Sequence, residues 1–153
     1  MKIKASLLFI SSLIFCACYS ARNDGATAAL KIQGTNYSIQ IKRVHIHAFL
    51  AEYDRFLILT ANGKSVAKLQ IATDTGGYSR ANVFSTKSGS VFLVQDLMGK
   101  YEVDVSRQEI KKMDFDCKSA DDGNFIGAFD IDESEKWKFI SVWERRLLSV
   151  CSN

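Results

Sequence analysis

The chain has 153 residues, 20 basic and 17 acidic side chains, a formal net charge of +3 and no proline. This length is enough for one domain with a hydrophobic core and too short for two comfortable ones. Without Lys2 and Lys4, which open the chain, the charges nearly balance. The sequence therefore lacks the strongly basic character typical of nucleic-acid-binding proteins, and we expect no nucleic-acid partner.

The first segment has the layout of a secretory signal peptide. Lys2 and Lys4 precede an apolar block from Ala5 to Ala17 that is interrupted only by three serines. A block of 13 residues is well short of the roughly 20 that a membrane-spanning helix needs. We therefore expect residues 1–17 to be a signal peptide and the protein to be exported.

The end of this segment, Phe15-Cys16-Ala17-Cys18, resembles a bacterial lipobox, in which a small residue precedes the cysteine that receives the lipid. The resemblance implies a periplasmic or outer-membrane-anchored bacterial lipoprotein with its lipid on Cys18 and residues 18–29 as a short tether. The membrane is then a partner only through acylated Cys18. Phe15 departs from the usual Leu of such boxes, and ordinary cleavage after Ser20 is the alternative.

Export leaves two cysteines in the domain, Cys117 and Cys151, because Cys16 is removed and Cys18 is either acylated or removed. In an oxidising compartment we expect these two to form a disulfide. Their separation is 151 − 117 = 34 residues, and closing such a loop stabilises a fold by about 3 to 4 kcal/mol. Two separately buried thiols are the alternative.

Residues 30–153 predict a single, mainly β domain built of hairpins. Apolar and polar residues alternate on both sides of Gly34, and Asn62-Gly63 separates two further strand-like runs, as in a type I′ hairpin turn. Ser88-Gly89 and Met98-Gly99-Lys100 are predicted turns between short runs rich in Val, Phe and Tyr. Strands at intervals of about eight to twelve residues favour an antiparallel β-sandwich or barrel.

The C-terminal third predicts one more hairpin and one or two short helices. The two strands of this hairpin lie on either side of an acidic loop. Within each strand the apolar residues are two positions apart, so we expect four side chains to face the core: Phe129, Ile131, Trp137 and Phe139. Two Ser-x-x-Glu capping boxes predict the helices: Ser106 with Glu109, and Ser141 with Glu144, the second running to about Val150.

His45 and His47 are the metal-ligand candidates. Side chains two residues apart share one face of a strand, so both imidazoles can point the same way. A catalytic zinc site needs a third protein ligand, for which only Glu52 and Asp54 are nearby. A solvated strand face explains the pair more simply, so we expect no metal and no cofactor, and keep an envelope hydrolase around these histidines as an alternative function.

Other motifs of catalysis or ion binding are incomplete. Gly63-Lys64-Ser65 lacks the earlier glycine of a phosphate-binding loop, since position 58 is Ile. Asp121-Asp122-Gly123 does not fit the ligand spacing of an EF-hand calcium loop, and no Gly-x-Ser-x-Gly elbow occurs. We therefore do not expect an enzyme.

Two segments are candidates for binding. The polar loop of residues 73–82 contains Tyr78 and Arg80, residue types that often anchor interfaces. Residues 113–153 carry 9 acidic and 5 basic side chains, and this acidic end would complement a basic partner. The acidic candidates are Asp121, Asp122, Asp132 and Glu133.

The expected function is that of a small exported binding protein of the bacterial cell envelope, lipid-anchored if Cys18 is acylated. An inhibitor or immunity protein that blocks a secreted enzyme fits the size and the acidic end, with a protein of the envelope as partner. A structural envelope lipoprotein is a further alternative.

Overall fold

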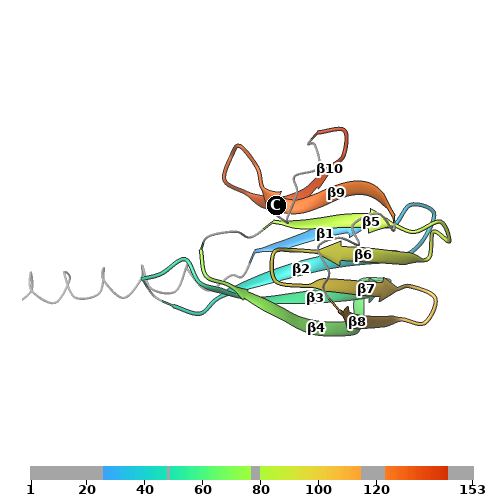
Figure 1. Cartoon of the computed structure of the whole chain (residues 1–153), viewed down its shortest axis with the longest axis horizontal. Coiled ribbons are helices and arrows are strands. Elements are labelled where there is room, and N and C mark those ends of the chain that lie inside the picture. Colours follow the sequence, from blue (N-terminus) through green and yellow to red (C-terminus); the bar gives the residue numbers. More distant parts are fainter. Residues whose placement is uncertain (1–25, 48, 77–79, 115–122, 145–153) are drawn as a thin grey trace, which may run out of the picture.

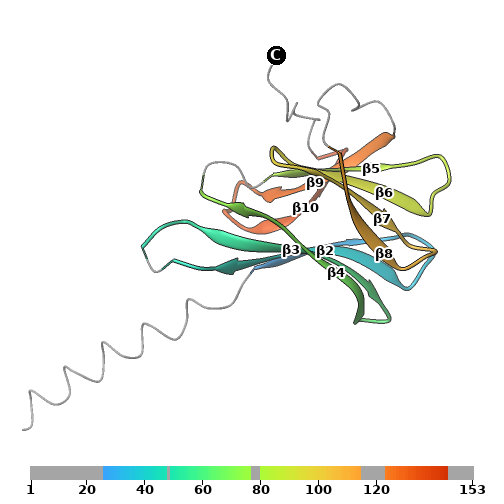
Figure 2. The same cartoon turned by 60° about the horizontal axis from the view of Figure 1, so that its bottom comes forward.

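The computed structural model describes residues 26–47, 49–76, 80–114 and 123–144, which form two antiparallel sheets stacked as a sandwich (Figures 1 and 2). The first sheet is a meander of four strands in chain order: β1 (Thr27–Lys31), β2 (Tyr37–His45), β3 (Tyr53–Ala61) and β4 (Lys64–Asp74). The second sheet has the order β10-β9-β5-β6-β7-β8. Its strands are β5 (Ala81–Ser85), β6 (Val91–Gln95), β7 (Lys100–Asp104), β8 (Glu109–Met113), β9 (Asn124–Ile131) and β10 (Trp137–Ser141). The expected mainly β fold, built of antiparallel sheets, is therefore confirmed.

The predicted turns are confirmed as the connections of hairpins. Asn62 and Gly63, with φ of 50° and 75°, join β3 to β4, as the two positive φ angles of a type I′ turn require. Gly34 lies between β1 and β2, Gly89 between β5 and β6, and Gly99 between β6 and β7. Hairpin geometry therefore follows from local turn chemistry over most of the chain.

The core lies between the sheets and is built by side-chain alternation. Ile39 and Ile41 on β2 face Val94, Val103 and other buried side chains of the second sheet. Trp137 lies in this core, and its indole Nε1 donates a hydrogen bond to the carbonyl of Ile41, 3.1 Å away. This bond joins β10 of one sheet to β2 of the other.

Several details differ from the sequence-based expectations. Phe129, Trp137 and Phe139 pack in or against the core as expected, but Ile131 is 37% exposed because it ends β9 beside the acidic loop. Ser106 starts no helix, because Glu109, the second residue of the predicted capping box, pairs with Asp104 in the β7–β8 ladder and the chain turns directly into β8. The described residues contain no helix after Ser141 either. Residues 145–153, Cys117 and Cys151 lie outside the described part, so the disulfide stays a prediction.

The sandwich has two different ends. The connections β2–β3, β4–β5, β6–β7 and β9–β10 lie at one end, called here the loop end, on the left of Figure 1. The turns β1–β2, β3–β4, β5–β6 and β7–β8 lie at the opposite, hairpin end. β1 also begins at the loop end, because Thr27 pairs with Lys42 near the close of β2. Strand β1 includes residues 27–29, which the sequence analysis predicted to be part of the tether.

Replacing one buried leucine tests the core. Leu59→Ala is expected to lower the free energy of unfolding by about 2 to 5 kcal/mol, because it removes buried methyl groups and leaves a cavity. The same change at Leu97, which is 50% exposed, should cost less than about 1 kcal/mol. Urea unfolding of both variants measures the difference, and equal losses would contradict this placement of the core.

Candidate functional site

The loop end is held together by charged side chains inside the sandwich. Arg55 on β3 is only 1% exposed, and its Nη2 lies 2.7 Å from Oδ2 of Asp96, which follows β6 in the other sheet. A buried guanidinium is costly unless it is paired and hydrogen-bonded. The pair therefore links the two sheets where the β6–β7 turn begins.

Arg55 also binds a backbone carbonyl at a β-bulge between β3 and β4 in the first sheet. The register of β3 with β4 shifts between Tyr53 and Arg55, and Ala72 has no partner in the ladder there. The Ala72 carbonyl accepts a bond from Arg55 Nε at 2.8 Å, and its N–H donates to the Tyr101 hydroxyl at 3.4 Å. Side chains from both sheets thus bind the backbone groups that the bulge leaves free of the ladder.

A second buried pair lies in the same interior. Arg43 on β2 places Nη2 3.0 Å from Oδ2 of Asp74 at the end of β4. Its guanidinium lies 3.9 Å from the centre of the Tyr53 ring and 4.9 Å from that of Trp137. Aromatic faces stabilise a cation that is removed from water. Arg43 therefore connects β2, β3 and β4 with β10 of the other sheet.

A third arginine belongs to the second sheet. Arg80 precedes β5 and is 2% exposed; its Nε donates to Asn82 and its Nη1 lies 3.4 Å from Oδ2 of Asp130 on β9. The sequence singled out Arg80 as a surface anchor for a partner, but the structure places it inside. Tyr78, its companion in that prediction, lies outside the described residues.

Each of these aspartates also binds a backbone N–H that is close to it in the chain. The second oxygen of Asp74 accepts the N–H of Gly76 at 2.9 Å, and that of Asp96 accepts the N–H of Met98 at 2.8 Å. Asp130 binds the N–H of Ile131 in the same way at 2.8 Å. The carboxylates of Asp74 and Asp96 thus connect buried arginines to loop backbone, so these two loops are ordered before any partner binds.

The loop end displays large apolar side chains to solvent. The β2–β3 loop, residues 46–52 apart from position 48, is called here the finger. In both cartoons it reaches further from the sheets than the other loops of that end. Ile46, Phe49 and Leu50 of the finger are 49%, 91% and 51% exposed. Leu97 and Met98 of the β6–β7 turn are exposed as well.

The two histidines lie at the base of the finger and bind within it. His45 Nε2 is 2.8 Å from the carbonyl of Leu50, and His47 Nδ1 accepts the N–H of Phe49 at 3.4 Å. Over residues 26–47, 49–76, 80–114 and 123–144, no three potential metal ligands come together. In this arrangement the imidazoles order the finger.

The acidic candidates Asp132 and Glu133 line an open hollow of about 390 Å³ beside the β9–β10 hairpin. Ser134, Lys138, Ile140 and Glu144 complete its lining. Lys138 Nζ is 3.3 Å from Asp132, and Glu144 accepts the N–H of Ser141 at 3.1 Å. Asp121 and Asp122 lie outside the described residues, so the hollow unites two of the four acidic candidates.

Hydrogen bonds set the ionisation of the loop carboxylates. The N–H of Lys136, the hydroxyl and N–H of Ser134, and Lys138 lower the pKa of Asp132 from 3.8 to about 2. The Ser106 hydroxyl and the Arg107 N–H lower the pKa of Asp104 in the same manner. Burial, and then the charge of Asp96, raises the pKa of the Tyr101 hydroxyl.

The buried arginines were missed in the sequence although a signal for two of them exists. Arg43 continues the alternation of Ile39 and Ile41, and Arg55 is in phase with Leu57 and Leu59. A charged residue in phase with core positions indicates a buried ion that must have a partner. Their partners follow 31 and 41 residues later, so no local pattern points to them.

Comparison with known proteins gives no match: no family model, no curated protein and no solved structure is similar to the chain. Within the described ranges, no helix has the length and apolar character needed to span a membrane.

Breaking the link between the sheets should strongly destabilise the protein. Asp96→Ala leaves the guanidinium of Arg55 buried without its carboxylate, which typically costs about 3 to 5 kcal/mol. Arg107→Ala is the control, because Arg107 pairs with Asp104 at the surface and should cost less than about 1 kcal/mol. Urea unfolding compares them; losses of similar size would show that Arg55 does not depend on Asp96.

The stability of the protein at acid pH tests the hydrogen bonding of Asp132. Folding lowers the pKa of Asp132, so its contribution to stability is present above about pH 4 and is lost as the pH falls towards 2. Asp132→Asn removes this titration, and the urea midpoint should then fall less steeply between pH 5 and pH 2, roughly the range set by the two pKa values. An unchanged acid slope would contradict the hydrogen bonding of this carboxylate.

Proposed function

We propose that the protein is an exported, lipid-anchored binding protein of the bacterial envelope that holds a basic protein partner at the acidic hollow. An inhibitor or immunity protein acting on a secreted enzyme is the form of this function that we favour. The observation that carries the proposal is the hollow itself, whose lining contains three carboxylates and one ammonium group.

The charge of the hollow supports a basic partner. Lys138 pairs with Asp132, so the carboxylates of Glu133 and Glu144 give the lining its net negative charge. Complementary charges attract a partner over a distance and fix its orientation. Ile140, which is 5% exposed, and Ser134 add an apolar and a hydroxyl side chain to the lining.

The rigidity of the loop supports tight binding. One oxygen of Asp132 accepts bonds from the N–H of Ser134, the hydroxyl of Ser134 and the N–H of Lys136, at 2.8 to 2.9 Å. The loop closes with a backbone bond from Asp132 to Lys136 at 2.9 Å. A loop that is ordered in the free protein loses less entropy on binding.

Reversal of one charge tests the hollow. Glu133→Lys should weaken capture of the partner about tenfold or more, because it places an ammonium group where the partner is basic. Glu109→Lys, on β8, makes the same change of net charge away from the hollow and should leave capture unchanged. The measurement is a quantitative pull-down with the mature protein from the host's envelope and secreted fractions.

The salt dependence and the control decide the result. The proposal expects one dominant retained protein that is released as salt is raised, since screening weakens exposed charge pairs. No retained protein, or equal losses for both variants, would reject a basic partner at the hollow. Lipid anchorage is measured separately by intact mass: cleavage after Ser20 without acyl chains would reject it.

A further inference from the structure

The finger carries an unusual apolar tip. Ile46, Phe49 and Leu50 expose about half or more of their surface, and Phe49 is almost fully exposed. Residues 46–51 contain no acidic residue, lysine or arginine. An exposed cluster of this kind marks a surface that is covered in the working protein.

The finger tip is ordered. His45 Nε2 is within hydrogen-bond distance of the Leu50 carbonyl, and the N–H of Ile46 donates to the Glu52 carbonyl at 3.1 Å. The Phe49 ring lies edge-on to the His47 ring, with centroids 6.4 Å apart. The apolar side chains are thus presented on a short, internally bonded structure.

The chain enters the sandwich at the base of this finger. The carbonyl of Ala26 accepts the N–H of Arg43 at 2.9 Å, and Arg43 lies two residues before His45, where β2 ends. Cys18 precedes Ala26 by 26 − 18 = 8 residues, which span at most about 29 Å when fully extended. A lipid on Cys18 would therefore hold the loop end close to the bilayer surface.

We propose that the finger inserts Ile46, Phe49 and Leu50 into the interface of the bilayer that holds the lipid of Cys18. This inference rests on the lipid anchorage in the proposed function. The tether makes insertion an intramolecular step at high effective concentration, so three apolar side chains suffice although they would bind membranes weakly alone. The lack of charge between residues 46 and 51 favours lipid over a polar protein surface.

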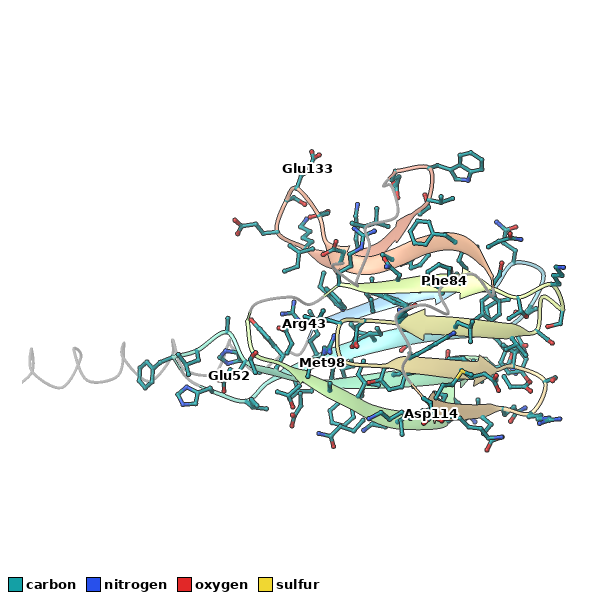
Figure 3. The ribbon with its side chains drawn as sticks, viewed as in Figure 1. Arg43, Glu52, Phe84, Met98, Asp114 and Glu133 are labelled. Atoms are coloured by element: carbon teal, nitrogen blue, oxygen red, sulfur yellow. The ribbon has the colours of Figure 1, made fainter. Side chains whose placement is uncertain are left out.

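Insertion of the finger also orients the domain. Figure 3 draws Glu133 well away from Glu52, which lies at the base of the finger. The acidic hollow is thus outside the inserted tip and accessible to a partner. Two membrane contacts, the lipid and the finger, fix the direction in which the hollow faces.

Tryptophan quenching by brominated lipid tests the insertion. The mature chain, as its host processes and acylates it, is reconstituted into phosphatidylcholine vesicles with and without bromine on the acyl chains. Phe49→Trp places a new fluorophore at the finger tip, and Lys87→Trp places one in the β5–β6 turn at the hairpin end. Trp137 and Trp143 are common to both variants, so each signal is read relative to the unmodified chain.

The expected result is quenching at one position only. Brominated lipid should remove about half or more of the fluorescence added at position 49 and none of that added at position 87. Vesicle-bound chain with no quenching at position 49, or with equal quenching at both positions, would overturn the insertion and leave anchorage intact. A chain that does not float with vesicles would overturn anchorage and insertion together.

A protein cleft is the competing occupant of the finger, and the pull-down distinguishes it. Phe49→Ser should leave capture of the partner at the acidic hollow unchanged, because the finger is outside the hollow. If Phe49→Ser abolishes capture while Glu133→Lys does not, the finger enters a protein cleft and the assignment to lipid is wrong.

Discussion

The loop end depends on a single constraint: the guanidinium of Arg55 is buried and must be satisfied. It binds Asp96 of the opposite sheet and the Ala72 carbonyl at the bulge of β4. Asp96 in turn binds the backbone of Met98 and so shapes the β6–β7 turn. One charged side chain thereby joins two sheets, an edge strand and a loop, where an apolar residue would only fill space.

Two further aspartates at the loop end bind a buried arginine in the same way. Asp74 and Asp130 each bind one arginine and one backbone N–H, as Asp96 does. The opposite end relies on tight turns such as Asn62-Gly63, which need no buried charge. The molecule thus combines a hairpin end closed by tight turns with a loop end in which buried arginine–aspartate pairs bind nearby backbone N–H groups. The finger belongs to the loop end, whereas the acidic hollow extends from the β9–β10 loop along β10 to Glu144.

Prediction from the sequence succeeded where structure is local. The Asn-Gly pair and the alternation around Gly34 specify hairpins within about ten residues, and these hairpins formed. The prediction of a helix at Ser106 was wrong, because Glu109 pairs with Asp104 in the β7–β8 ladder instead of completing a helix cap. Prediction also failed for Arg55, whose burial is visible in the strand period but whose partner depends on the packing of the two sheets.

In the candidate site, too, the sequence predicted some residues, and others became evident only in the folded structure. Asp132 and Glu133 were recognised from the acidic composition, and the structure adds that they line one hollow with Glu144. The apolar finger was not recognised, because Ile46, Phe49 and Leu50 in a sequence are indistinguishable from core residues. Only the three-dimensional fold shows that they protrude beside the start of β1.

Amide hydrogen exchange in an Arg55→Met variant tests most directly whether the buried ion pairs order the loop end. The account predicts that the Met98 amide, which binds Asp96, exchanges much faster in the variant under conditions where it stays folded. The Gly89 amide at the hairpin end, which bonds to the Thr86 carbonyl, should exchange at an unchanged rate. An unchanged exchange rate at Met98 would contradict the claim that Arg55 orders this end through Asp96.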